Sequence, residues 1–192
     1  MGAYWQTIMC CFLRGEGFYN RVVEIISGYF GGQAEQVWIP ANAVRAAGVR
    51  PAVSALNAQG FFVLSFADGQ DRNAQFNIQV PPDMDRSLPC QFCMGWSSPA
   101  TDKTLIADLT YLITAPGEDT EAAPTVQAGN AFTSAAVADG LVISLFPEIP
   151  GGTVGDDDVC FHVALERDGN NVLDTLGDVM ELHGVALRYT TL

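Results

Sequence analysis

Polar and apolar residues alternate strictly over residues 75–80, and a proline pair ends the run. Successive side chains of a β-strand point to opposite faces, so Phe76, Ile78 and Val80 share one face that we expect to be buried. The polar residues between them face water or a neighbouring subunit. Such a segment is typical of a half-buried antiparallel strand.

The same alternation, or a short run of β-branched and apolar residues, recurs along the chain. We predict strands at residues 37–39, 52–56, 61–66, 75–80, 90–96, 103–114, 141–145, 159–166 and 184–190. Eight to nine strands at roughly regular spacing indicate an all-β fold, an antiparallel β-sandwich or jelly roll. We assign this domain to residues 34–192.

Two connections carry their own signals. Asp68-Gly69 lies between two predicted strands, and this dipeptide favours the tight turn of a β-hairpin. Residues 115–140 are acidic and turn-rich, then rich in Ala, Thr and Ser. We interpret this second segment as a long excursion between sheets or as an exposed loop that contacts partners.

Residues 1–33 differ from the rest of the chain and are treated as a separate N-terminal arm. Six apolar residues fall at helical spacing and predict an amphipathic helix that ends at Gly31-Gly32. About twelve residues are too few for a stable isolated helix, so this helix needs a surface to pack on. It packs on its own domain or docks on a neighbouring subunit, unless the segment is a variable extension. The predicted interaction residues are Phe18, Val22, Ile25, Ile26, Tyr29 and Phe30.

The charge balance limits the partners. The 192 residues include 22 acidic and 9 basic side chains, a formal charge of −13. This excess repels the phosphates of nucleic acids and anionic membrane surfaces. No window is long and apolar enough for a membrane helix. We therefore expect neither a nucleic acid nor a membrane as partner, and a basic protein surface fits better.

Five cysteines, an odd number, argue against a disulfide framework and favour a reducing cytoplasm until assembly or release. Cys90 and Cys93 have the spacing of a zinc knuckle, and further ligands would have to come from Cys160, His162 or His183. Residues three apart on a strand point to opposite faces, however, so buried structural thiols are the favoured interpretation.

Asp156, Asp157 and Asp158 form an acidic loop cluster of the kind that can bind calcium. They lack the ligand order of a helix-loop-helix calcium site, and solvated turns are the more common explanation. We keep these three as weak metal candidates and predict no cofactor.

No set of catalytic residues is recognisable. His162 alternates with core residues, no Gly-x-Ser-x-Gly elbow is present, and Ser97-Ser98 have no evident partner in the sequence. The glycine pairs lack the lysine of a phosphate-binding loop. We predict that the chain is not an enzyme.

The order of several features resembles small jelly-roll proteins among the virion structural proteins of tailed phages and metagenomic viruses. The resemblance covers roughly residues 37–190. It rests on Trp38-Ile39-Pro40-Ala41, Asp68-Gly69-Gln70-Asp71, the segment 76–85, Gly95-Trp96-Ser97-Ser98, Gly155-Asp156-Asp157-Asp158, Arg167-Asp168 and the segment 184–189.

This resemblance implies a non-enzymatic virion component, such as a capsid decoration protein or head spike. It implies self-association as a trimer or other homo-oligomer, contacts with other virion or capsid proteins, and assembly in the host cytoplasm. The alternative is a carbohydrate- or receptor-binding β-sandwich module. Its expected contacts are Trp96 and the loops around Asp83, Arg167 and Asn170.

Overall fold

The structure, a computed structural model, describes residues 34–46 and 51–192. The predicted N-terminal arm, with its six interaction residues, lies outside these ranges. Within them the chain forms eleven strands and one short 3-10 turn. The strands are β1 (Ala34–Pro40), β2 (Arg45–Ala46), β3 (Val53–Leu56), β4 (Phe62–Phe66), β5 (Arg72–Gln79), β6 (Cys90–Ser97), β7 (Thr104–Thr114), β8 (Thr125–Thr133), β9 (Val142–Ile149), β10 (Cys160–Arg167) and β11 (Met180–Thr190), and the turn is η1 (Ala41–Ala43).

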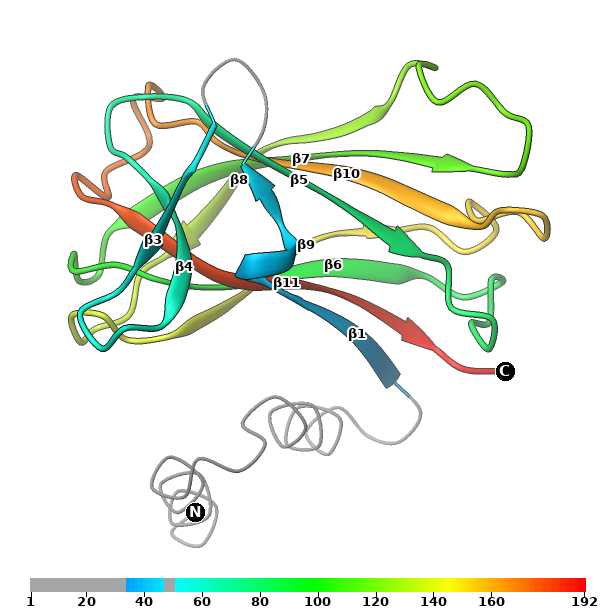
Figure 1. Cartoon of the computed structure of the whole chain (residues 1–192), viewed down its shortest axis with the longest axis horizontal. Coiled ribbons are helices and arrows are strands. Elements are labelled where there is room, and N and C mark those ends of the chain that lie inside the picture. The colour runs from blue at the N-terminus through cyan, green and yellow to red at the C-terminus, as the bar shows by residue number, and fades with distance from the viewer. Residues whose placement is uncertain (1–33, 47–50) are drawn as a thin grey trace, which may run out of the picture.

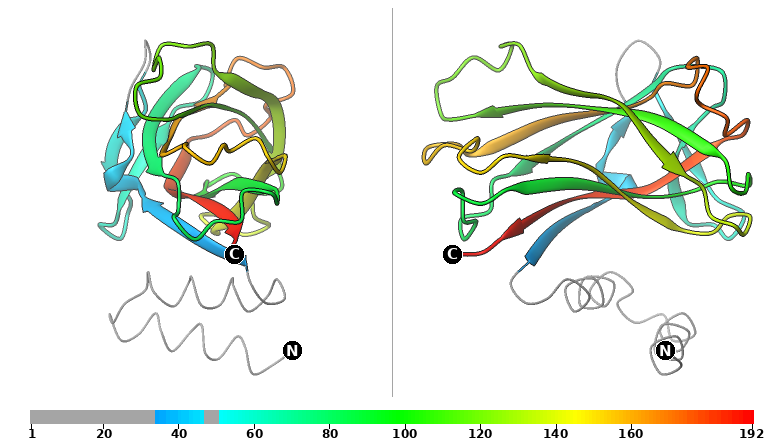
Figure 2. Two further views of the ribbon diagram at one scale, coloured as in Figure 1. Left: turned by 90° about the vertical axis from the view of Figure 1, so that its right-hand side faces the viewer. Right: turned by 180° about the vertical axis from the view of Figure 1, so that it is seen from behind.

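The strands form two antiparallel sheets that pack face to face (Figure 1). Sheet A has the order β3-β4-β11-β6-β9, with β1 also paired to β11, and sheet B has the order β2-β5-β10-β7-β8. Seen end-on in Figure 2, the two layers enclose a single core. This confirms the predicted fold class, an all-β antiparallel sandwich of the jelly-roll type.

One edge of β11 is shared by two strands. Its first residues pair with β4, from Met180 to Leu182, and the segment from Gly184 to Thr190 pairs with β1. The opposite edge pairs with β6 along most of its length, with a register shift between Leu182 and Gly184. β11 is therefore the central strand of sheet A.

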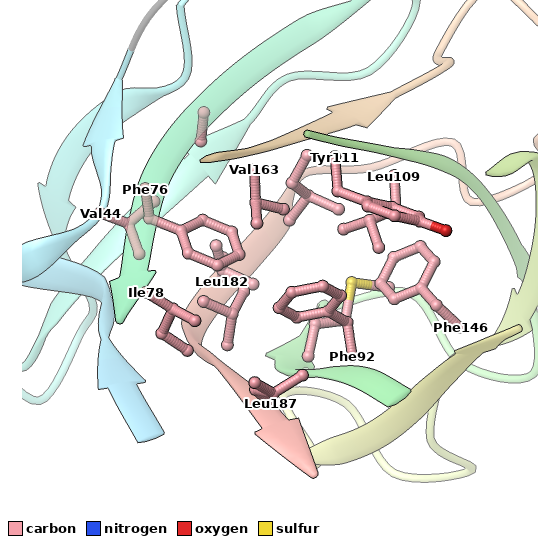
Figure 3. Packing of buried hydrophobic residues seen from close by; sticks show 14 of the residues in the cluster. Val44, Phe76, Ile78, Phe92, Leu109, Tyr111, Phe146, Val163, Leu182 and Leu187 are labelled. Carbon is pink, nitrogen blue, oxygen red and sulfur yellow. The ribbon is translucent and has the colours of Figure 1, made fainter. Parts of the chain in front are cut away.

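The core forms where the inward faces of the two sheets meet. The predicted alternation is confirmed, because Phe76 and Ile78 of β5 and Val80 just after it are buried, while Gln75, Asn77 and Gln79 are exposed. Phe92 of β6 packs edge-on against Phe76 and Phe161 of sheet B, with ring centroids 6.1 Å and 5.5 Å away (Figure 3). Edge-to-face pairs of this kind add to the burial of apolar area and hold the sheets in register.

The prediction of a β-hairpin at Asp68-Gly69 is wrong. The turn is present, with Gly69 at φ 65, but it joins β4 of sheet A to β5 of sheet B. The buried guanidinium of Arg167 binds the Phe66 carbonyl and the Asp68 carboxylate where the chain leaves sheet A. An Asp-Gly pair reports local backbone geometry only, so it cannot show whether the flanking strands pair with each other.

The excursion predicted over residues 115–140 contains a strand. Residues 115–124 connect β7 to β8, and these two strands pair antiparallel in sheet B. β8 is an edge strand with mostly exposed residues, and Gly129 at φ 70 lies near a shift in its register. Its small and polar residues give little apolar alternation, which is why the sequence does not predict it.

Candidate functional site

The outer face of sheet A carries two apolar rows that cross four strands. Strand register aligns the first row from β1 through β11 and β6 to β9, and the second row lies beside it. The first row is Trp38, Ala186, Cys93 and Leu145, and the second is Pro40, Gly184, Gly95 and Ile143. We call these eight residues the apolar band.

Residues of the band point away from the core. Their neighbours in sequence, such as Phe92, Met94, Val185 and Leu187, belong to the buried cluster between the sheets. Alternation along a strand therefore places the band on the opposite, outward face. At the β9 end of the band, Ile143 and Leu145 are 38% and 39% exposed.

Trp38 fits over the two glycines of the band. A Cβ placed on Gly184 would lie 2.6 Å from Trp38 Cζ2, and one placed on Gly95 would lie 2.8 Å from Trp38 Cη2. The indole ring therefore lies in the space that two side chains would otherwise fill. Glycine inside a strand often marks such a close approach.

The apolar band ends at a polar row. Gln36, Arg188, Gln91 and Glu148 align across the same four strands, next to the row that contains Trp38. This boundary gives the band a defined edge on one side. On the other side, beyond the glycines, lie Ser97, Glu181 and His183.

Ser97, His183 and Glu181 form a hydrogen-bonded cluster. His183 Nε2 lies 2.9 Å from Ser97 Oγ, and the Ser97 hydroxyl donates to the Glu181 carboxylate. Burial lowers the pKa of His183, which favours the neutral ring. Burial, and then the nearby Asp139 carboxylate, raise the pKa of Glu181. This cluster could not be predicted from the sequence, because 86 residues separate its serine from its histidine.

The order of these contacts differs from that of a serine hydrolase. In a catalytic triad the base accepts the serine proton, and the carboxylate binds the other ring nitrogen of the base. Here the Glu181 carboxylate accepts a hydrogen bond from the Ser97 hydroxyl, which leaves the serine oxygen to accept Nε2–H of His183. Ser97 is also only 3% exposed. The cluster therefore does not place a base to activate an accessible nucleophile.

The outer face of sheet B is polar at the comparable position. Register aligns Gln75, Ala164 and Thr110 in one row and Asn77, His162 and Leu112 in the next. Polar outward residues of this kind are usual for an antiparallel sheet with one solvated face. The outer face is therefore apolar on sheet A and mainly polar on sheet B.

His162 uses both ring nitrogens on the face of sheet B. Its Nδ1 lies 3.2 Å from Asn77 Oδ1, and its Nε2 lies 3.1 Å from Thr114 Oγ1. The amide oxygen accepts, so Nδ1 carries the proton and Nε2 accepts from the threonine hydroxyl. Both nitrogens are therefore engaged in the fold.

The cysteines are separated in the way that strand geometry predicts. Cys90 points into the core and Cys93 points into the apolar band, and burial raises the pKa of each thiol to about 11. Cys160 lies on sheet B and is half-buried. In the part of the chain that the structure describes, no three His, Cys, Asp or Glu side chains gather closely enough to hold a metal ion.

Asp156, Asp157 and Asp158 lie in the turn between β9 and β10. Asp158 Oδ2 accepts from Gly155 N at 2.6 Å, which closes the turn on itself. The Arg86 guanidinium donates to the Gly155 carbonyl and, at 3.1 Å, to the Asp158 carbonyl. The positively charged Arg86 side chain therefore already binds two carbonyl oxygens of the turn, while the Asp156 and Asp157 side chains remain exposed.

Two contacts expected for a carbohydrate-binding module are not available. Trp96 is fully buried and donates its indole N–H to Ser144 Oγ at 2.9 Å. Arg167 is also fully buried. Asp83 and Asn170 are both exposed, and Asp83 accepts from the Tyr189 hydroxyl. These residues do not form one surface.

Two loops at one end of the molecule expose large apolar side chains. Leu56 and Phe61, at the β3–β4 tip, are 67% and 65% exposed. Val172 and Leu173, between β10 and β11, are 92% and 66% exposed. Both loops lie at the left in Figure 1 and at the right in the reverse view of Figure 2. Among the described residues no helix has the length and apolar character needed to cross a membrane.

No protein-family model and no curated protein sequence matches this chain. Solved structures of similar architecture include a family two carbohydrate esterase from Cellvibrio japonicus (10% identity, 82% of this chain, 35% of that chain, TM-score 0.40). Another is the infectious bursal disease virus Gx strain (11% identity, 82% of this chain, 33% of that chain, TM-score 0.41). A third is the C-terminal CBM6 of LamC from Zobellia galactanivorans (10% identity, 80% of this chain, 98% of that chain, TM-score 0.41).

The chain spans about a third of the length of the first two of these proteins. The matched structures come from a virus, a carbohydrate-binding module and an enzyme. At these identities and TM-scores the likeness concerns chain architecture, and it assigns no function.

Proposed function

We propose that this chain is a non-enzymatic structural protein of a virion, of the capsid decoration or spike kind, that assembles with copies of itself and with other virion proteins. The observation that carries the proposal is the exposure of Leu56, Phe61, Val172 and Leu173 in two loops at one end of the sandwich. Apolar side chains exposed to this extent and gathered at one end mark a surface for association.

The chemistry of the other candidate groups supports a role without catalysis. In the serine–histidine pair described above, the serine hydroxyl donates its hydrogen bond to the Glu181 carboxylate and not to the histidine. The turn with the aspartates is held by Arg86. Both arrangements stabilise the fold and leave no free reactive group at their centre.

Light scattering coupled to size-exclusion chromatography tests the assembly. We expect the full chain to form a stable symmetric oligomer, and Leu56→Ser/Phe61→Ser and Val172→Ser/Leu173→Ser to weaken it. Val126→Ser is the matched control, because Val126 is 56% exposed on the edge strand β8 and outside both loops. A monomer at every concentration, unchanged by the loop variants, would contradict the proposal.

The virion role itself is tested by the genes beside this one. Capsid, portal or tail genes in the neighbourhood support it. A neighbourhood of metabolic genes, with none of these, counts against it even if the chain forms an oligomer.

A second function is favoured by a separate observation, the polar outer face of sheet B. Gln75, Asn77 and Thr110 lie on this face, Gln75 and Asn77 are exposed, and their amide and hydroxyl groups suit a polyhydroxylated ligand. A glycan array tests this carbohydrate-binding alternative. Binding that is lost in Gln75→Ala/Asn77→Ala supports it, and an array without binding contradicts it.

A further inference from the structure

We propose that the N-terminal segment 18–30 of the same molecule covers the apolar band on the outer face of sheet A. This inference concerns the place where the segment binds, and it does not depend on a virion role. It joins two features: a sheet face with two apolar rows that no other described strand covers, and an apolar stripe predicted at helical spacing.

The band has the chemistry of a buried surface. Its eight residues carry no charged side chain, and no side chain among them is polar apart from the Cys93 thiol. The outward face of an antiparallel sheet that meets water is normally polar, as it is on sheet B of this molecule. Leu145 and Ile143 are the exposed part of the band, and covering them removes their apolar area from water.

The shape of the band suits a helix that lies across the strands. Trp38, Ala186, Cys93 and Leu145 lie on four adjacent strands. Four strands at a spacing of ~4.8 Å place the outer two about 15 Å apart. A helix from Phe18 to Phe30 would be about 20 Å long, enough to cover both rows from β1 to β9.

The point where the segment joins the domain makes contact within one molecule favourable. The described chain begins at Ala34, the first residue of β1, and β1 itself supplies Trp38 and Pro40 to the band. Only residues 31–33 connect the predicted stripe to this strand. A short tether gives the stripe a high effective concentration at the band, which a second copy in dilute solution does not match.

Disulfide trapping in the full chain tests the placement. In a chain with Cys10→Ser, Cys11→Ser, Cys93→Ala and Cys160→Ser, we combine Ile26→Cys with Leu145→Cys in the band. The matched control combines Ile26→Cys with Gln75→Cys, which is exposed on the polar face of sheet B. We expect a disulfide within the monomer that forms several-fold faster with residue 145 than with residue 75. Equal rates for the two pairs would overturn the proposal.

Separating the disulfide-linked products by mass on non-reducing gels also shows whether a second copy of the chain covers the band instead. A disulfide-linked dimer formed by Leu145→Cys alone, or dimers as the main product of the pair, would show that a second copy covers the band and would overturn the proposal. The product within one chain is recognised by its monomeric mass and by the linked peptides after digestion.

Tryptophan quenching tests the proposal without cysteines. In a Trp5→Phe chain, acrylamide reports on Trp38, because Trp96 is buried in the core. We expect Ile25→Ser/Ile26→Ser to increase quenching of Trp38. Arg21→Ser/Glu24→Ser, which changes residues off the stripe, is expected to leave quenching unchanged. No increase in the first variant, or the same increase in both, would contradict the placement.

Discussion

Arg167 and Asp174 form an ion pair from which solvent is excluded on both sides. Arg167 Nε lies 3.0 Å from Asp174 Oδ2, and both side chains have no exposed surface. Arg167 extends from β10 of sheet B, and it also binds the Phe66 and Asp178 carbonyls and the Asp68 carboxylate. With two bonds to Asp174, these contacts use all five N–H groups of the guanidinium.

Loss of this arginine is expected to be strongly destabilising. Arg167→Met would leave the Asp174 carboxylate buried without its cation, and breaking a buried pair in this way costs about 3–5 kcal/mol. Urea unfolding measures the change. Arg72→Met is the control, because Arg72 forms hydrogen bonds with the Pro51 carbonyl and with Gln70 that are exposed to solvent. Similar losses for the two variants would show that Arg167 has no special role.

The glycine beneath Trp38 provides a second prediction. In Gly184→Ala the new Cβ would lie 2.6 Å from both the Trp38 ring and the Ile39 carbonyl. The backbone cannot move away freely, so we expect a loss of about 1–3 kcal/mol, as for overpacking in a core. The thermal midpoint and the emission of Trp38 report it. Gly155→Ala, whose Cβ would be 3.4 Å from its nearest neighbour, should cost far less.

The partly buried His183 should make stability depend on pH. Burial holds its pKa below the ordinary value of 6.5, so the unfolded chain binds a proton before the folded chain does. The contribution of His183 to stability is therefore complete above pH 6.5 and declines as the pH falls from there towards its folded pKa. Unfolding free energies of wild type and His183→Gln, measured across this range, should converge as the pH falls. Parallel curves would contradict the prediction.

Glu166 should show the opposite sign. Its pKa is raised from 4.5 by burial and by repulsion from Asp71, Asp108 and Asp168. A raised carboxyl pKa means that the folded state favours the protonated form, so ionisation at neutral pH destabilises the fold. Glu166→Gln is expected to raise the thermal midpoint at pH 7.5, and the gain should vanish below pH 4.5. Glu148→Gln, on the exposed part of β9, is the control. A gain that persists in acid would point to packing instead of charge.

Strands with clear alternation could be predicted from the sequence, and strands without it could not. The nine predicted segments correspond to β1, β3–β7 and β9–β11. Most of them have one face that must be buried, whereas β3 has exposed Val53 and Leu56 and is predicted from its short apolar run. β8 and the two-residue β2 have little or no such face. The Asp68-Gly69 turn shows the same limit, since a local turn signal contains nothing about which sheet the next strand joins.

The candidate surfaces were harder to predict for a related reason. Gly95 and Ala186 each lie between two core residues, and Gly184 precedes the core residue Val185; these small residues were the sign of an apolar outer face in the sequence. Sequence alone does not give the register that aligns them with Trp38 and Leu145. Trp96 shows the reverse error, because a tryptophan at a strand end looks available for binding until the strand is placed in the sheet.

The division of one edge of β11 between β4 and β1 sets a limit on how far the chain can be shortened. Seven residues of β1, from Ala34 to Pro40, cover the segment from Gly184 to Thr190. A chain that starts after Pro40 would leave that backbone as an open edge beside the middle of the sheet. Open edges recruit strands from other molecules, so such a chain would be prone to fibrous aggregation, and it would also lack Val37 and Ile39, which pack against the core.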